Sequence, residues 1–282
     1  MKKILLAAIA SGLFMTSFSQ DSTKQERTDT IKQERADTIK IGGMVIIKKG
    51  DKNDTTKNRN ISISNRNRQK KSNLQTNWFI VDLGFANYND NTNYSSAEAQ
   101  AFAPLGDKDQ LELRTGKSVN VNIWLFMQKL NITKHVLNLK YGLGLELNNY
   151  RFDDERVQLL QDPTKVVLNP EWTDLKKNKL AADYVTVPLM LNLNLTPKKE
   201  KGLGISGGIS AGYLYSARQK IKEGDDEEKT HDNFDLRKWK LAYIGELSLG
   251  PIKLYGSYAM KSMWEKGLDQ TPYNVGLRLS KF

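Results

Sequence analysis

The sequence predicts an all-β protein: an eight-stranded antiparallel up-and-down transmembrane β-barrel, preceded by a signal peptide and by a basic leader that we expect to be largely disordered. Three observations predict this fold. From residue 77 onward, apolar residues alternate with small or polar ones in eight segments. The connections between these segments alternate between long and short. No segment contains the run of about 18 apolar residues that a membrane-spanning helix needs.

The composition excludes several classes of protein. The chain has 282 residues, with no Cys and two His, which excludes a disulfide scaffold, a thiolate metal site and a His-rich metal site. The mean hydropathy of −0.57 argues against a bundle of membrane helices. Because the sequence has no nucleophile motif, phosphate loop or metal triad, we predict neither catalysis nor a cofactor.

Residues 1–19 have the pattern of a secretory signal peptide. Two lysines precede an apolar stretch from Ile4 to Phe14, and Ser17 and Ser19 place small residues before a cleavage site at Gln20. The apolar stretch is too short to cross a bilayer. We therefore expect an exported protein.

Residues 20–76 form a polar basic leader in this interpretation, with a short hairpin predicted at 38–47 around a Gly-Gly pair. The segment KQERTDTI at 24–31 repeats as KQERADTI at 32–39. The leader holds 14 Lys and Arg against 7 Asp and Glu, whereas residues 77–282 hold 27 against 25. The leader thus accounts for most of the net charge of +11. We expect a charged spacer that can contact an envelope protein, and not nucleic acid, because no aromatic residues are interleaved with its cations.

The eight alternating segments have one face of Leu, Ile, Val and aromatic residues and one face of Gly, Ser, Asn and Thr with a few charges. We predict strands at 78–87, 119–127, 137–148, 183–195, 203–215, 239–249, 252–260 and 273–279. The connections run long, short, long, short, long, minimal and intermediate in that order. Outer-membrane barrels combine short periplasmic turns with longer outer loops, so residues 77–282 are expected to form such a barrel.

The size of the side chains favours a membrane barrel over a soluble ligand-binding barrel. Small polar residues fit the narrow interior of eight strands, whereas a water-facing surface usually has long Lys and Glu side chains. In a soluble barrel Leu139, Leu143, Leu191 and Ile205 would instead converge on the centre. Aromatic girdles are also expected, with Trp78 at one rim and, at the other, Tyr88, Tyr150, Tyr184, Tyr213, Tyr215, Trp239, Tyr243, Tyr258 and Tyr273.

Six charged residues fall on the face that is predicted to point inward. They are Asp82, Lys140, Glu146, Glu246, Lys253 and Arg278. Three acids and three bases balance, and buried charges must pair because an isolated one costs several kcal/mol. We therefore predict a structural network that fills the lumen. The alternative is a narrow channel or small-molecule transporter.

One long connection contains an acidic stretch with a histidine. Its members are Asp225, Asp226, Glu227, Glu228 and His231. They are candidates for an outer-rim hydrolase, or for a divalent cation that bridges the loop to lipopolysaccharide phosphates. Since all of them lie on a single loop, we favour a solvated loop tip over either kind of site.

Two neighbouring strands resemble those of a known family. The segment Asp183–Asn192, DYVTVPLMLN, resembles the Y-x-x-x-P-L-x-L strand of PorT-like outer-membrane β-barrel proteins, and Gly204–Tyr213 is similar to the Gly-rich strand that follows it. The resemblance covers residues 77–282 and implies a location in the cell outer membrane. An even number of strands puts both termini on the side of the short turns, so we expect the leader in the periplasm. The C-terminal Phe282 is aromatic, as in assembly signals, but is out of phase with Leu279 and Leu277.

The resemblance implies outer-membrane lipids, lipopolysaccharide and the barrel assembly machinery as partners. The function that we predict is that of an integral outer-membrane β-barrel protein without catalysis. It would have a structural or interaction role through its outer loops and its leader.

Overall fold

The computed structural model describes residues 37–41, 44–48, 62–64, 72–105, 107–197 and 202–280. The chain divides into two compact units, at Lys70 and Lys71. The first unit contains strands β1 (Asp37–Ile41), β2 (Met44–Lys48) and β3 (Ser62–Ser64), which form an antiparallel sheet in the order β1-β2-β3. The predicted signal peptide and Phe282 lie outside the described residues.

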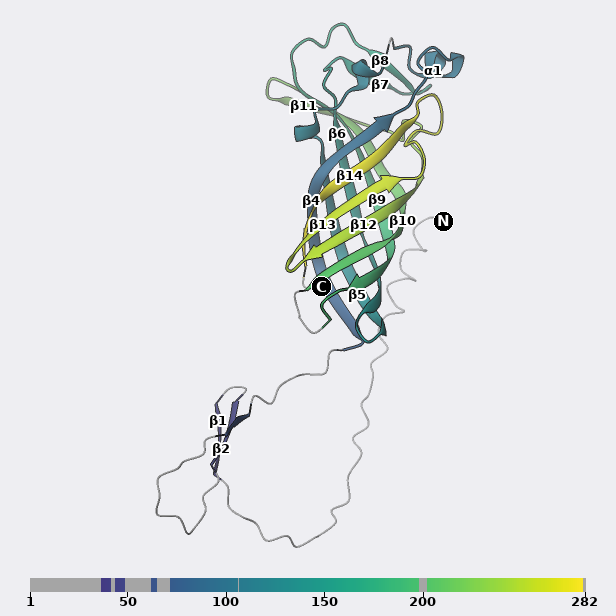
Figure 1. The fold of residues 1–282 in the computed structure, drawn as a ribbon. Helices are drawn as coiled ribbons and strands as arrows, with labels where there is room; N and C mark the ends of the chain where they lie inside the picture. The colour runs from purple at the N-terminus through teal and green to yellow at the C-terminus, as the bar shows by residue number, and fades with distance from the viewer. Residues whose placement is uncertain are drawn as a thin grey trace, which may run out of the picture. The chain divides into compact units, whose positions relative to one another are not determined.

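The second unit is a closed barrel of eight antiparallel strands, as the sequence predicts (Figure 1). Each strand pairs with its neighbour along the chain, and the barrel closes where the last strand pairs with the first. The strands are β4 (Leu74–Asp90), β5 (Val119–Thr133), β6 (Leu137–Arg151), β9 (Leu175–Asn194), β10 (Leu203–Glu223), β12 (Trp239–Leu249), β13 (Ile252–Ala259) and β14 (Gln270–Leu279).

The long connections gather at one end of the barrel, and the short turns lie at the other (Figure 1). We call these the loop end and the turn end. The loop end contains α1 (Ala97–Phe102), the 3₁₀ helices η1 (Lys108–Leu111) and η2 (Thr115–Lys117), the hairpin of β7 (Val157–Leu160) and β8 (Lys165–Leu168), and β11 (Asp226–His231). None of the helices in the described part of the chain has the length and apolar character required to cross a membrane.

The apolar face of every barrel strand points outward. Leu191 is 55 % exposed and Ile205 is 52 % exposed, whereas the alternate neighbours Asn192 and Ser206 are buried. Strand β6 alternates without a break between buried and half-buried positions along its whole length. The interior is polar and the exterior is a continuous apolar belt, so the prediction of a membrane-type barrel is confirmed and the soluble barrel is excluded.

A bulge changes the alternation on one strand. The pairing of β5 with β6 shifts between Trp124 and Phe126, which leaves Leu125 as an extra residue. The alternation in 119–127 predicts Met127 on the same apolar, lipid-facing side as Leu125, but Met127 is 2 % exposed and lies inside the barrel. This detail of the prediction was wrong because an extra residue reverses the phase of the strand beyond it.

Aromatic residues line both edges of the apolar belt. Trp78 and Phe126 are in contact near the turn end, with ring centroids 5.9 Å apart. At the other edge Tyr243, Tyr258 and Tyr273 are paired in one row across three strands. Tyr273 pairs with Asn87, nine residues from Trp78 on β4. At ~3.4 Å per residue and a tilt of about 40°, the two edges are ~23 Å apart, close to the ~25 Å band of membrane barrels.

Three tyrosines that were predicted in this girdle point into the protein. Tyr150 and Tyr184 are 1 % and 3 % exposed, and Tyr88 packs against the same buried cluster at the loop end. Their phase on the strands is the inward one, because their alternate neighbours Asn149 and Val185 are on the outer surface. Their proximity to the long loops was therefore not sufficient evidence for a place in the girdle.

Strands β9 and β10 extend well beyond the belt, and their polarity reverses there. Within the belt Val185 faces outward and Thr186 inward, whereas beyond it Lys179 faces outward and Leu180 is 1 % exposed. A shift in the pairing of β10 between Leu214 and Ser216 marks the change. A polar exterior around an apolar interior is the pattern of a protein in water, so the lipid boundary lies near this shift.

We expect the substitution Leu191→Arg to lower the free energy of unfolding by ~2–4 kcal/mol, because it places a charge in the middle of the lipid-facing belt. The control is Val185→Arg on the same strand, beside the aromatic edge, for which the expected loss is ~0–1 kcal/mol. Urea unfolding in phospholipid vesicles measures both. Equal losses for the two variants would contradict a depth-dependent lipid environment.

Candidate functional site

The lumen contains a chain of paired charges that begins on neighbouring strands. Asp82 on β4 and Arg278 on β14 are direct register partners. The Nε and Nη2 atoms of Arg278 each lie 2.7 Å from a carboxylate oxygen of Asp82, and its Nη1 lies 2.7 Å from Glu246 Oε2. Lys140 forms an ion pair with the other oxygen of Glu246. All four residues are buried, and the shared carboxylate of Glu246 links the two bases.

A second ion pair crosses the lumen beside the first. Glu146 on β6 pairs with Lys240 on β12, just as Lys140 on β6 pairs with Glu246 on β12. Since β6 and β12 are not adjacent in the sheet, both pairs join opposite walls of the barrel. We call them the cross-lumen pairs. Asn274 also donates a hydrogen bond of 3.1 Å to Glu146 Oε1.

Two large aromatic side chains fill the space around these charges. The indole N–H of Trp124 donates to Asp82 over 2.7 Å, and the guanidinium of Arg278 lies 5.3 Å from the Trp124 ring centroid. Gly144 makes room for Trp124, because a Cβ atom there would lie 2.7 Å from the indole ring. Gly276 does the same for Tyr255, whose ring would lie 2.7 Å from an added Cβ. Glycine on the inner face is thus required where a large ring crosses the lumen.

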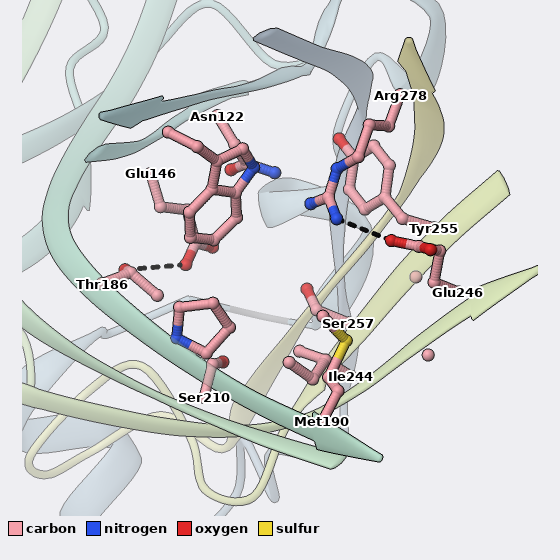
Figure 2. Close-up of a pocket in the computed structure, with 14 residues that line it drawn as sticks. Asn122, Glu146, Thr186, Met190, Ser210, Ile244, Glu246, Tyr255, Ser257 and Arg278 are labelled. Carbon is pink, nitrogen blue, oxygen red and sulfur yellow. Dashed lines mark hydrogen bonds and ion pairs between the residues drawn. The ribbon is translucent and has the colours of Figure 1, made fainter. Parts of the chain in front are cut away.

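A cavity beside these ion pairs inside the barrel is small. Its volume is about 40 Å³, and Figure 2 shows Glu146, Thr186, Glu246 and Arg278 around it. This is room for a few water molecules. The carboxylates of Glu146 and Glu246 beside this cavity are engaged by bases and, for Glu146, by the amide of Asn274.

The structure places all six charged residues predicted for the lumen inside the barrel. Five of them form ion pairs there, whereas Lys253 binds a backbone carbonyl group. That lysine is 1 % exposed, and its ammonium donates to the carbonyl oxygen of Ser280 over 2.8 Å. The base that pairs with Glu146 is Lys240, which the sequence analysis missed. The sequence does carry a signal for its inward position, because Lys240 is in phase with Glu246 on the inner face of β12.

The loop end is closed by a second buried layer, which we call the cap. In the cap, inward-facing residues from the parts of the strands beyond the belt pack against residues of all the long connections. Its buried apolar members are Ala86, Tyr94, Phe102, Ala103, Leu105, Leu111, Leu113, Tyr150, Phe152, Val157, Leu159, Val166, Leu180, Ala182, Tyr184, Leu214, Ala217, Phe234, Leu236, Met263, Trp264 and Leu268. The long connections therefore form a packed body above the lumen, which no pattern in the sequence had indicated.

Buried amides fix the cap to the barrel wall. Gln219 on β10 accepts a hydrogen bond from the backbone N–H of Leu159 over 2.9 Å and donates to the carbonyl oxygen of Val157 over 2.8 Å. Asn178 on β9 donates to the same carbonyl oxygen over 2.5 Å. These bonds hold the β7–β8 hairpin against the strand extensions, since a buried amide is costly without its partners.

A hollow of about 460 Å³ opens at the loop end of β12, where the pairing of β12 with β13 stops at Ala242 and Ala259. Tyr184 and Lys240 line its inner side, and Trp239 lines its outer side. It is thus a recess in the wall between the cap and the aromatic edge. The cross-lumen pairs lie on its inward side, because Lys240 belongs to one of them.

The acidic stretch predicted as a candidate site forms one strand of a hairpin with β10. Glu227 contacts three bases, at 2.6 Å for Lys220, 3.2 Å for Lys229 and 3.7 Å for Lys177. The hydrogen bond from Lys220 and the neighbouring cations lower the pKa of Glu227 to about 2. Asp225, Asp226, Glu228 and His231 are exposed. Within the described ranges, no three His, Cys, Asp or Glu side chains converge as a metal site would require.

Comparison with known proteins identifies the family. A family model for the outer membrane protein beta-barrel domain matches residues 75–260. No curated protein matches the chain. The matched residues include seven of the eight barrel strands, from β4 to β13. The chain therefore belongs to the outer membrane protein beta-barrel domain family and is an outer-membrane β-barrel protein.

Proposed function

We propose that this outer-membrane barrel is a sealed, non-catalytic protein with a structural or interaction role, exerted by the loop end outside the cell and by the leader in the periplasm. The observation that supports the proposal best is the double closure of the lumen. The cross-lumen pairs join opposite walls through Glu246 and Glu146, and the cap packs above them.

The order of the chain supports this orientation. The short turns of membrane barrels lie in the periplasm and the long loops outside. Strand β4 begins and β14 ends at the turn end, where Leu74 pairs with Leu130 and Leu279 pairs with Ile252. The leader precedes β4 in the chain, so on this orientation it would lie in the periplasm. On this proposal the barrel assembly machinery inserts the protein, and an envelope protein binds the leader.

The cap favours an interaction role over transport. Its side chains pack around a common core that includes Phe234 and Trp264, so the loops present a surface of fixed shape. A fixed surface loses less conformational entropy on binding than free loops do. Outer-membrane lipids and lipopolysaccharide would surround the belt.

We expect the purified protein to show no discrete conductance steps in planar lipid bilayers, because paired side chains occupy the lumen and no continuous water path remains. A porin in the same bilayers is the control that shows that insertion and recording work. Heat-modifiable mobility in gels confirms that the sample is a folded barrel. Steps from the folded protein would favour the narrow channel or small-molecule transporter instead.

A further inference from the structure

Four cations stand in one row on the outer wall of the strand extensions. Arg151 on β6 pairs with Lys179 on β9, Lys179 pairs with Lys220 on β10, and Lys220 pairs with Lys229 on β11. We call this set the basic row. Direct cross-strand neighbours of like charge destabilise a sheet, so four in succession need a compensating negative charge.

The protein itself supplies little of that charge. Glu227 pairs with Lys220 and Lys229 at one end of the basic row. Lys179 donates to the side-chain oxygen of Asn149, and Arg151 donates to the carbonyl oxygen of Lys176. Among the described residues, neither Lys179 nor Arg151 forms an ion pair, so this half of the basic row retains its positive charge.

The surroundings of Lys179 add to this excess. Lys177 precedes it on β9, Arg218 and Lys220 lie beside it on β10, and Arg151 faces it from β6, while Glu227 on β11 is an acid that acts on it in the opposite direction. Burial, followed by the charges of Lys177, Lys220 and Arg218, lowers the pKa of Lys179 to about 8.

The basic row lies directly outside the lipid belt. On β6, Leu147 is the last apolar residue of the outer face, and Arg151 follows four residues later on the same face. At ~3.4 Å per residue and a tilt of about 40°, Arg151 is ~10 Å beyond Leu147. The headgroups of a bilayer occupy ~5–8 Å on each side of the hydrocarbon. The backbone of Arg151 is thus just beyond this layer, and long Arg and Lys side chains can reach back to headgroups at its outer edge.

We propose that the basic row binds the phosphate groups of lipopolysaccharide in the outer leaflet. Guanidinium and ammonium groups on neighbouring strands form charge-assisted hydrogen bonds with phosphate oxygens. The apolar face of β6, β9 and β10 below the row takes the acyl chains. The inference rests on the proposed orientation, in which the loop end faces outward.

Fluorescent lipopolysaccharide titrated against the full mature chain in a zwitterionic detergent measures the affinity. We expect the triple variant Arg151→Gln, Lys179→Gln and Lys220→Gln to bind on the order of 100-fold more weakly, since each cation near a charged membrane surface contributes severalfold. The matched control is Lys108→Gln, Lys117→Gln and Lys261→Gln, three exposed cations of the same end. Its affinity should stay within about twofold of that of the unaltered protein.

The pH dependence tests the same site by a different readout. Phosphate binds the protonated form of Lys179, so affinity should fall severalfold as the pH rises from 7 to 9 through the pKa of about 8. Lys179→Arg keeps its charge over this range. It should bind as the unaltered protein does at pH 7 and should lose the decline.

Three results would overturn the inference: equal binding by the triple variant, equal binding of dephosphorylated lipopolysaccharide, or full competition by inorganic phosphate at the concentration of the lipid. Heat-modifiable mobility shows that each variant is folded. The proposed function fails separately. Cleavage of the loop end only from the periplasmic side would refute the orientation, and conductance steps would refute the sealed lumen, whatever the affinity.

Discussion

Arg278→Met should lower the free energy of unfolding by ~3–5 kcal/mol, the largest loss that we expect in the lumen. The substitution removes the bidentate partner of Asp82 and one of the two bases on Glu246. Asp82 is 0 % exposed, so its carboxylate would be left buried without a base, and breaking a buried pair costs this much. Urea unfolding in vesicles gives the measurement.

Two further variants test whether the loss comes from the Asp82–Arg278 ion pair. Lys266→Ala removes an exposed partner of Asp235 and should cost less than ~1 kcal/mol. Adding Asp82→Asn to Arg278→Met removes the stranded charge, so the double variant should be more stable than Arg278→Met alone. A double variant that is less stable than the single one would contradict the pairing.

Trp264→Ala should open the cap while the barrel remains closed. Trp264 is 3 % exposed, its ring lies 5.5 Å from that of Phe102, and its indole N–H donates to Gln270 over 2.8 Å. Removing a buried Trp side chain costs ~3–5 kcal/mol. Because the lost contacts belong to the cap, the loss should appear as local opening of the loop end.

Limited trypsin digestion measures that opening. In the variant, the bonds after Arg156 and Lys165, which are exposed at the β7–β8 hairpin, should be cleaved faster because the backbone there is no longer held by the cap. The barrel should keep its heat-modifiable mobility. Trp239→Ala is the matched control, because Trp239 is 60 % exposed on the lipid side and its loss should leave the cap protected. Equal cleavage of both variants would show that the cap does not depend on its buried core.

The barrel could be read from the sequence because one physical rule governs every belt residue. Lipid requires apolar residues outside, and the narrow lumen requires small or paired polar residues inside. The strict alternation of β6 follows from this rule. Met127 was predicted on the wrong face because a bulge is set by local backbone geometry and leaves no signal in the composition.

The contents of the lumen could be predicted in part from the sequence, whereas the cap could not. The inward phase identified Asp82, Glu246 and Arg278 as neighbours in one interior, but phase alone cannot tell which acid meets which base across the barrel. Lys240 lies at the very start of β12, next to a long connection, where the alternation is too short to place a side chain with certainty on the inner face. The cap joins residues from all the long connections through contacts of high sequence separation, which periodicity within a segment cannot reveal.

The reversal of polarity along β9 and β10 has a consequence for how the protein reaches its final form. The lipid hydrocarbon can stabilise the part of these strands within the belt as soon as they insert. The part at the loop end gains stability only when residues of the long connections cover Leu180 and Leu214 in the cap. Insertion of the belt into lipid and packing of the cap away from water are thus two separate steps. Closure of the hairpins should therefore precede burial of the tryptophan at residue 264, with a delay set by translocation of the loops.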